Sequence, residues 1–440
     1  MNLLNWPHWT VLGIEETEQA YSVTAALKAR PATCIHCGTI GQLDRFGKQH
    51  QLFVDLPAHG KRLSIRVVRQ RYRCTACGRT FLEPLADMDE RHAATRRLVA
   101  YIHREAMRRT FVSVAEEVGL AESTVRRVFG EHAYALEAAR QVVTPEWLGI
   151  DEIHLGGKPR CVLTNVRQRT MLDLLRDRHR STVVAFLQGL PDKQWVELVT
   201  MDMWRPYKEA VNLVLPHAQI VVDKFHVLRL ANAALETVRK EHRRQLGRSQ
   251  RRRLMHDRFL LLKRRRDLMP QEELVLESWT FAFPTLAHAY EAKEAFYALW
   301  ELPDRQAAKE GYGVWRRDLS RELESAFRDL TTAMEHWESE VFAYFDHPIT
   351  NAYTESLNNL IRLTNRIGRG YSFAAIRAKL LYAVGWRVPA KPVLRRLAPE
   401  QRLAPPPEGV PVASSPERPD TADYGPSLPI LVKRLSRGRL

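Results

Sequence analysis

Two cysteine pairs of identical spacing constrain the first part of the chain more than any other feature. Cys34 and Cys37 form one Cys-x-x-Cys pair, and Cys74 and Cys77 form a second pair 36 residues further on. A glycine follows each pair, which suits the tight turn that aims two thiolates at one point. Four thiolates complete the tetrahedral ligand set of a structural zinc site and leave no position open for water. We therefore expect residues 1–90 to form a small zinc-binding β module with structural Zn²⁺, in preference to a redox dithiol.

The charge balance indicates the kind of partner. Lys and Arg number 67 and Asp and Glu number 51, which gives a formal net charge of +16 at pH 7. Such an excess favours a polyphosphate partner, most simply nucleic acid. A basic protein of the membrane surface would need an amphipathic helix or a lipidation signal, and we find neither. The sequence also shows no signal peptide and no apolar stretch of membrane-spanning length, so we expect a cytoplasmic protein with no membrane partner.

The segment between the cysteine pairs alternates apolar and polar residues as strands do. The second of its predicted strands, residues 62–73, carries five arginines. A β-ribbon with this charge density can lie on DNA phosphates, and a solvated strand face is the alternative. We expect Arg66, Arg69 and Arg71 to contact DNA.

Residues 91–142 are predicted to be helical and contain a helix-turn-helix pattern. Gly119 makes the turn, and the second helix directs two valines inward. We expect Ser123 to cap this helix, and Arg126 and Arg127 to project from it toward DNA. A plain helical hairpin matches the same pattern, but the neighbouring cysteine pairs and the basic charge favour DNA binding.

The pattern changes to strands at Trp147. Three antiparallel strands are predicted, followed by helix, strand, helix and strand, over residues 143–226. This order is that of an RNase H-like domain. An all-α insertion is expected over residues 227–345, and a C-terminal core helix over residues 346–388. We thus predict a multidomain α/β protein.

Two basic segments stay open to interpretation. Residues 239–266 are dense in arginine, and we weigh a solvated face equally against a track for the DNA backbone. Residues 389–440 are rich in Pro and Arg, a composition that cannot build a core, so we predict a disordered tail.

Three acidic residues lie where an RNase H-like core would bring them together. Asp151 lies in the first strand, Asp202 ends the fourth, and Glu355 lies on the C-terminal helix. Acids within apolar strands need a reason, because an unpaired buried carboxylate is costly. Phosphodiester cleavage is served by two Mg²⁺ ions (or Mn²⁺) held by carboxylates from separate elements. We therefore predict these three residues as catalytic ligands of Mg²⁺.

Asp223 also ends an apolar strand, one strand further from the first than Asp202. Neighbouring strands lie about 4.8 Å apart, which starts Asp223 about 10 Å from the first strand. We predict that Asp202 binds metal directly, while Asp223 and His226 orient a ligand or contact DNA.

The C-terminal helix is expected to have two faces. Its 3.6-residue period places Leu357 and Leu360 on a packed face. The same period places Glu355, Asn358 and Arg362 together on the opposite face, where they could hold metal and nearby phosphates.

In this order, the motifs resemble the ISL3 family of bacterial insertion-sequence transposases. They are Gly-Ile-Asp151-Glu, Asp202-Met-Trp-Arg-Pro-Tyr, Val-Val-Asp223-Lys-Phe-His226-Val and Asn351-Ala-x-x-Glu355-x-x-Asn358. The resemblance covers about residues 30–385. It implies a DDE-type enzyme with Asp151, Asp202 and Glu355 as its triad, which recognises terminal inverted repeats and performs Mg²⁺-dependent cleavage and strand transfer.

The same resemblance implies its partners. These are double-stranded DNA, as transposon ends and as target, and further copies of the chain, because two ends must be paired before joining. We expect the protein at the bacterial nucleoid. Two alternatives stay open: a catalytically inactive DNA-binding regulator, and a structure-specific nuclease of the same fold.

Overall fold

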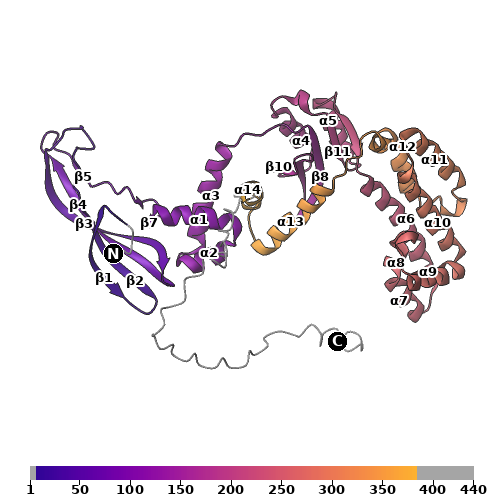
Figure 1. The fold of residues 1–440 in the computed structure, drawn as a ribbon, viewed down its shortest axis with the longest axis horizontal. Helices are drawn as coiled ribbons and strands as arrows, with labels where there is room; N and C mark the ends of the chain where they lie inside the picture. The colour runs from indigo at the N-terminus through magenta and orange to yellow at the C-terminus, as the bar shows by residue number, and fades with distance from the viewer. Residues whose placement is uncertain (1–5, 384–440) are drawn as a thin grey trace, which may run out of the picture. The chain divides into compact units, whose positions relative to one another are not determined.

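The computed structural model describes residues 6–383 (Figure 1). It contains β-rich, helical and mixed α/β parts in the predicted order, which confirms the multidomain α/β class. The predicted tail, residues 389–440, lies outside the described residues. Within residues 6–383, every helix is too short or too polar to cross a lipid bilayer.

The N-terminal module is built on one sheet with strand order β1-β2-β4-β3-β7-β6, and β5 pairs with β4. Its strands are β1 (Trp9–Glu16), β2 (Ala20–Leu27), β3 (Leu43–Ala58), β4 (Lys61–Cys74), β5 (Thr80–Leu82), β6 (Met88–Asp89) and β7 (Ala94–Thr95). The long antiparallel pair β3–β4 carries the cysteine pairs at its open end, because Leu43 faces Cys74 in the register. Apolar residues of β2, β3 and β4 fill its core.

Three helices follow the sheet: α1 (Arg96–Arg108), α2 (Phe111–Val118) and α3 (Glu122–Ala138). Gly119 ends α2 in the left-handed conformation with φ 71°, which an L side chain rarely adopts. The turn therefore lies where the sequence predicts it. Val114, Val118, Val125 and Val128 are buried between the helices.

The mixed α/β part that follows contains a five-stranded sheet with order β10-β9-β8-β11-β12. Its elements are β8 (Trp147–Leu155), β9 (Lys158–Asn165), β10 (Thr170–Leu175), α4 (Arg180–Gln188), η1 (Lys193–Trp195), β11 (Leu198–Met201), α5 (Arg205–Val214) and β12 (Gln219–Val222). The first three strands are antiparallel, and β11 and β12 run parallel to β8. This is the predicted RNase H-like arrangement.

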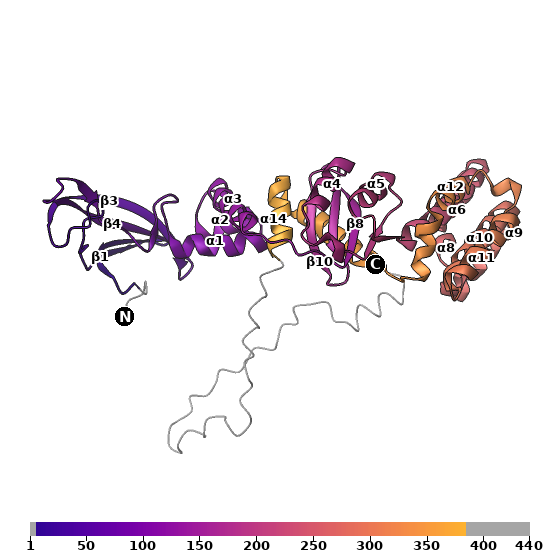
Figure 2. The same ribbon diagram turned by 90° about the horizontal axis from the view of Figure 1, so that it is seen from above.

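Helices cover both faces of this sheet (Figures 1 and 2). Leu148 and Ile150 of β8 pack against α4 and α5 on one face. Ile153 and Leu155 pack on the other face against α13 (Ala352–Gly368) and α14 (Phe373–Ala383). Because side chains alternate along a strand, Asp151 lies on the second face, toward α13.

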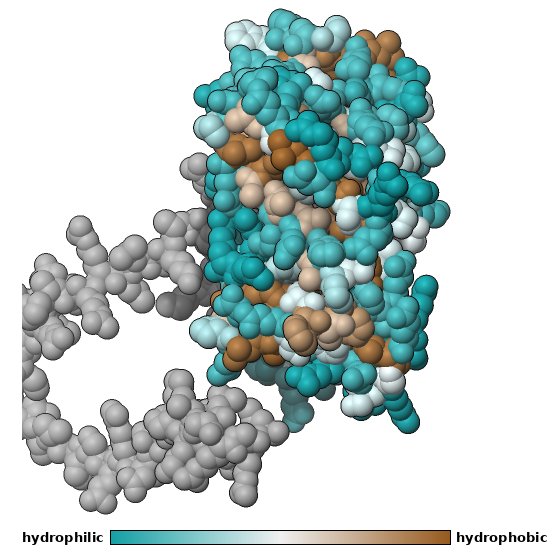
Figure 3. All heavy atoms as spheres, turned by 90° about the vertical axis from the view of Figure 1, so that its right-hand side faces the viewer, coloured by the Kyte–Doolittle hydropathy of each residue, from teal (hydrophilic) through white to brown (hydrophobic). Residues whose placement is uncertain are grey.

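The insertion is helical throughout. Its elements are α6 (Lys224–Gln245), α7 (Arg248–His256), α8 (Arg258–Leu262), η2 (Arg265–Asp267), α9 (Pro270–Ala282), α10 (Pro284–Ala298), η3 (Leu299–Glu301), α11 (Arg305–Asp318), η4 (Arg321–Leu323), α12 (Arg328–Phe342) and η5 (Ala343–Phe345). Trp279, Trp315 and Phe327 belong to its own hydrophobic core. Figure 3 views this end of the molecule and shows a largely hydrophilic face with apolar residues in scattered patches.

Helix α14 belongs to two cores. Ile376 and Leu380 pack on the sheet with α13, while Ala375 and Ala378 pack with α1, α2 and α3. The hydrophobic core of the helix-turn-helix part therefore includes residues of α14, which lie more than 200 residues beyond the predicted domain boundary at residue 142.

Candidate active site

Asp151 lies in the central strand of the sheet and is buried, with 5% of its surface exposed. Its Oδ1 accepts a hydrogen bond from the Glu152 backbone N–H (2.7 Å), and its Oδ2 accepts one from Asn358 Nδ2 (2.8 Å). Burial, together with the charges of Glu355 and Asp223, raises the pKa of Asp151 to about 6, against the hydrogen bonds from Glu152 and Asn358, which lower it. The hydrogen-bond donors to the Asp151 carboxylate are thus an amide side chain and a backbone N–H, and neither carries a positive charge.

Asp202 follows the last residue of β11. The parallel register pairs Met201 with Ile150, so the next residues, Asp202 and Asp151, lie beside each other at the same sheet edge. Burial raises the pKa of Asp202 to about 7, and the charge of Asp151 adds to the increase. Its Oδ1 is buried and has no hydrogen-bond partner among residues 6–383.

Asp223 follows β12 and caps the N-terminus of α6. Its Oδ1 accepts from the Phe225 backbone N–H (3.1 Å), and its Oδ2 accepts from the Asn351 backbone N–H (3.1 Å). The side chain is buried, with 2% exposed. One carboxylate therefore holds the starts of α6 and α13.

Glu355 lies in the first turn of α13. Burial raises its pKa above the ordinary value, and Asp223 adds to the increase. Three contacts dock this end of the helix on the sheet. Asn351 Nδ2 donates to the Ile150 carbonyl (3.4 Å), Thr354 donates to Asn351 Oδ1 (2.5 Å), and the Thr354 and Thr164 hydroxyls share a hydrogen bond of 2.8 Å.

Gly149 makes this docking possible. A Cβ at this position would lie 2.9 Å from Asn351 Oδ1 and still closer to the Thr164 hydroxyl. Any residue larger than glycine at position 149 would therefore clash with the side chains that dock α13 on the sheet. Sequence reasoning quoted Gly149 and Asn351 only as parts of motifs and missed their contact.

His226 lies between two groups of acids. One ligand atom each from Asp151, Asp202 and His226 lie within 4.8 Å of one another, and so do atoms from Asp223, His226 and Glu355. Burial lowers the pKa of His226, opposed by Asp223, and its Nδ1 has no hydrogen-bond partner within the described chain. The structure thus brings all predicted acids and His226 to one place, although Asp151, Asp202 and Glu355 do not form a group of three by this distance.

No cation among the described residues forms an ion pair with Asp151, Asp202, Asp223 or Glu355. Arg178 and Arg229 offset the charge of these acids only without direct contact. Four converging acids with no ion-pair partner among residues 6–383 fit a site for a hard divalent cation, whose preferred ligands are oxygen atoms. The partnerless Asp202 Oδ1 fits the same interpretation.

The face assignment of α13 needs correction. Asn358 is buried on the packed face with Leu357, whereas Leu360 is 44% exposed. The reason is that α13 packs against polar groups of the sheet as well as apolar ones, and Asn358 is satisfied there by Asp151. Arg362 lies on the exposed face and donates to Asn359 Oδ1 (3.0 Å).

The four cysteines of the N-terminal module converge. The Sγ atoms of Cys34 and Cys77 lie 3.8 Å apart, and those of Cys37 and Cys74 lie 3.7 Å apart. A tetrahedral zinc with Zn–S bonds of about 2.3 Å requires sulfur atoms about 3.8 Å apart. The geometry therefore fits one structural zinc ion.

The second helix of the helix-turn-helix begins two residues earlier than predicted. Ala121 occupies the N-cap position, with no side-chain cap, and Ser123 lies inside α3 with its side chain exposed. Ser123 is therefore not the cap. Arg126 pairs with Glu122 (2.5 Å), while Arg127 is exposed.

Arg69 is wrongly placed among the DNA-contacting arginines of β4. It is 5% exposed and forms two hydrogen bonds with Glu90, of 2.8 and 2.9 Å, and one with the Glu83 carbonyl (2.7 Å). An arginine held in this way fixes the module from within. Arg66 and Arg71 are exposed. Their contact with DNA stays a prediction.

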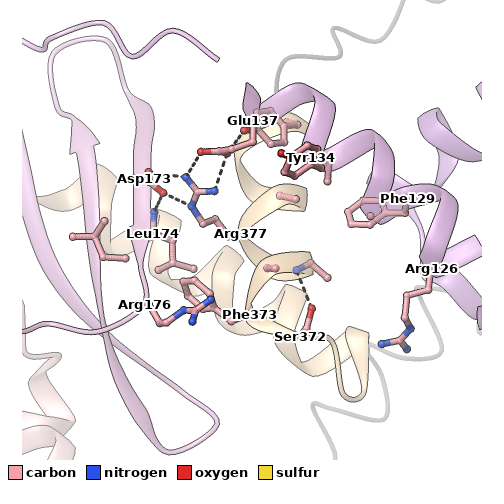
Figure 4. A pocket seen from close by; sticks show the side chains of 17 residues that line it. Arg126, Phe129, Tyr134, Glu137, Asp173, Leu174, Arg176, Ser372, Phe373 and Arg377 are labelled. Atoms are coloured by element: carbon pink, nitrogen blue, oxygen red, sulfur yellow. Dashed lines mark hydrogen bonds and ion pairs between the residues drawn. The ribbon is translucent and has the colours of Figure 1, made fainter. Parts of the chain in front are cut away.

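A hollow of about 550 Å³ lies where α3, β10 and α14 meet (Figure 4). Arg377 of α14 bonds Asp173 of β10 (2.6 Å) and Glu137 of α3 (2.8 Å). Burial opposes the charge of Arg377, but its bonds to the two carboxylates outweigh burial and raise its pKa. The bonds from Arg377, aided by Tyr382, lower the pKa of Glu137 to about 2.

Comparison with known proteins agrees with this architecture. A model of ISL3 transposases, described as "Transposase", matches residues 148–380. Two further models match residues 30–77, as "zinc-finger of transposase IS204/IS1001/IS1096/IS1165", and residues 83–133, as "Helix-turn-helix domain of transposase family ISL3". The transposase for insertion sequence element IS1001 of Bordetella parapertussis is 26% identical over 388 residues, which is 82% of this chain and 92% of that protein.

The matched segments follow one another in the same order as the β-rich, helical and mixed α/β parts. The zinc-finger match ends at Cys77, the helix-turn-helix match includes α1 and α2, and the transposase match runs from β8 into α14. The chain therefore belongs to the ISL3 family of transposases.

Proposed function

We propose that this chain binds the terminal inverted repeats of its own insertion sequence, cleaves DNA there and joins the ends to a target, in a reaction that depends on Mg²⁺. The observation that carries the proposal is the convergence of Asp151, Asp202, Asp223 and Glu355, none of which has an ion-pair partner among residues 6–383. Membership of a transposase family supports the reaction class, and the helix-turn-helix match supports DNA as substrate.

In this proposal Asp151, Asp202 and Glu355 hold the metal. Bound Mg²⁺ would activate the attacking oxygen and stabilise the leaving oxygen of the phosphodiester. Asn358 fixes the orientation of the Asp151 carboxylate by its hydrogen bond. Asp223 fixes the start of α13, and therefore the position of Glu355, through the Asn351 backbone. Burial lowers the pKa of His226, and a ring nitrogen of His226 lies within 4.8 Å of the acidic ligand atoms in each of the two groups.

DNA recognition is proposed for the N-terminal parts. Arg126 and Arg127 of α3 would enter the major groove, and Arg66 and Arg71 of β4 would contact phosphates. We also propose that the active form contains at least two copies of the chain, because two transposon ends must be paired, and that it acts at the nucleoid.

An end-cleavage assay tests the proposal. The substrate is a labelled duplex that carries an inverted repeat with its flanking DNA, incubated with the full chain in Mg²⁺ or in EDTA. We expect cleavage at the repeat boundary in Mg²⁺ only, and none by Asp151→Asn. Specific binding without cleavage would support a catalytically inactive regulator instead. Cleavage of branched DNA without preference for the repeat would support a structure-specific nuclease.

A further inference from the structure

One part of the insertion carries positive charge that nearby acids do not balance. Residues 243–256 cover the end of α6 and all of α7, and contain six arginines and no acidic residue. Arg248, Arg251, Arg252 and Arg253 of α7 are all exposed. Figure 1 labels α7 next to α8, at the end of α6.

Four other basic side chains of the same insertion form ion pairs with acidic residues. Distances to the acidic partner are 2.6 Å for Lys263–Glu272, 2.8 Å for Arg266–Glu301, 2.8 Å for Arg305–Asp346 and 3.0 Å for Lys309–Glu338. In α7, by contrast, Arg248 and Arg252 have no acidic partner among residues 6–383, and Arg253 only comes within 3.9 Å of Asp257. Arg316 and Arg317 of α11 also have no acidic partner among residues 6–383, but Asp318 follows them directly in the chain. What distinguishes residues 243–256 is the density of arginines with no acidic residue among them.

Helix α7 is anchored to the hydrophobic core of the insertion. Leu254 is fully buried in the insertion core. The buried guanidinium of Arg239 donates to the Leu254 carbonyl (3.3 Å), and Arg251 donates to the Arg244 carbonyl (3.2 Å). Arginines on an anchored helix lose less freedom on binding than those of a flexible arm, so they form a preorganised surface.

This surface has the chemistry of a phosphate contact. Arg248, Arg252, Arg253 and His256 line a hollow of about 610 Å³ together with Ser249. Arg248 and Arg252 are four residues apart, which makes them neighbours on one helix face, with Cβ atoms about 5–6 Å apart. Guanidinium groups bind phosphate oxygens in a bidentate manner, and duplex DNA carries one negative charge per about 1.7 Å of its axis.

We propose that α7 and the end of α6 form a second DNA-binding surface, which holds duplex DNA by its phosphates and independently of sequence. The proposal rests on the proposed function, because that function brings DNA to the chain. The two DNA-binding surfaces would then have different roles. Helix α3 would discriminate between DNA sequences, and the insertion would contribute affinity that does not depend on sequence.

Salt-dependent binding of the full chain tests this surface. Fluorescence anisotropy would compare an inverted-repeat duplex with a random-sequence duplex, in buffer without Mg²⁺ and without chelator, so that no cleavage occurs and the zinc site stays intact. Each lost phosphate contact reduces the slope of log K against log salt by about 0.9. We expect Arg248→Gln with Arg252→Gln to reduce the slope by about 2 and to weaken binding of both duplexes by the same factor.

Two control variants make the test specific. Arg266→Gln with Arg305→Gln removes two paired arginines from the same insertion and should retain the wild-type slope. Arg248→Lys with Arg252→Lys keeps the positive charge and should retain most of the wild-type slope. This variant separates the loss of charge from misfolding. A wild-type slope in the Gln variant, a loss confined to the inverted-repeat duplex, or preferential competition by double-stranded RNA would each overturn the proposal. Because no Mg²⁺ is present, this result is independent of whether Mg²⁺-dependent cleavage is found.

Discussion

Asp202 and Asp223 follow parallel strands of one sheet, but their surroundings differ. Both oxygens of Asp223 accept backbone N–H groups, at the starts of α6 and α13. Asp202 lies beside Asp151 and keeps a buried oxygen without a partner within the described chain. A carboxylate occupied by helix starts is suited to positioning, and one with free oxygen atoms is suited to binding a cation.

This difference predicts unequal effects of the same substitution. Asp202→Asn should abolish cleavage and leave binding of the inverted repeat intact. Asp223→Asn should reduce the cleavage rate by about 10- to 100-fold, the usual cost of losing a group that orients a metal ligand. Single-turnover cleavage rates in Mg²⁺ measure both. An inactive Asp223→Asn beside a substantially active Asp202→Asn would require a different set of metal ligands.

Single residues mark the limit of prediction from sequence. Asp151, Asp202 and Asp223 were identifiable because acids at the ends or centres of apolar strands need a purpose. Glu355 lies on a helix and was identified from the motif Asn351-Ala-x-x-Glu355-x-x-Asn358. Arg69 was misassigned because its partner Glu90 lies 21 residues away, and no local pattern reveals that pair. Asn358 was placed on the wrong face because its burial depends on a hydrogen bond to Asp151, 207 residues away.

Among the elements, α14 packs both against the helix-turn-helix part and against the five-stranded sheet. Lys379 of α14 donates to the carbonyls of Ala106 and Arg109, at the end of α1, and lies over the rings of Phe111 and Tyr371. Arg377 joins Glu137 and Asp173. The sequence order alone does not indicate this arrangement, because α14 shares no motif with α1 or α3.

The Arg377–Glu137 contact predicts a dependence of stability on pH. The pKa of Glu137 is about 2 in the folded chain and 4.5 ordinarily. Its stabilising contribution is therefore complete above pH 4.5 and is lost as the pH falls toward 2. Arg377→Gln should lower the melting temperature most above pH 4.5, and the difference from wild type should shrink below it. Thermal unfolding across this range measures the effect, with Arg127→Gln as an exposed control, and a constant difference would contradict the account.

Helix α3 carries the prediction on recognition. Replacing Arg126 and Arg127 with Gln should reduce the preference for the inverted repeat over random DNA, because each good base contact contributes about 1–3 kcal/mol of discrimination. Competition binding measures the ratio. Unchanged discrimination in the double variant would refute α3 as the recognition helix.

The β3–β4 hairpin carries the prediction on zinc. The sulfur geometry predicts about one zinc ion per chain, because four thiolates complete one tetrahedral site. Elemental analysis checks the stoichiometry. Removal of the metal, or Cys74→Ser, should unfold the module and abolish specific DNA binding, whereas Cys161→Ser serves as a control outside the site. A metal-free module that folds and binds DNA would contradict this role.

At the scale of the whole molecule, the order of parts was predictable and their interlocking was not. Cysteine spacing, the helix-turn-helix pattern and the strand order predict three parts in sequence. The strands β1 and β2 carry no motif, so they were covered only by the expectation of a β-rich module. The sharing of α14 depends on contacts between distant segments, which periodicity within one segment does not report.

The most direct test of the central claim is joining. The full chain in Mg²⁺ receives a pre-cleaved end, with its 3′-hydroxyl exposed at the repeat boundary, and a supercoiled plasmid as target. We predict covalent joining of the end to the plasmid by the wild type, and none by Asp202→Asn or in EDTA. Specific binding of the end without joined product, under conditions where the chain is folded and holds zinc, would contradict the assignment of this chain as an active transposase.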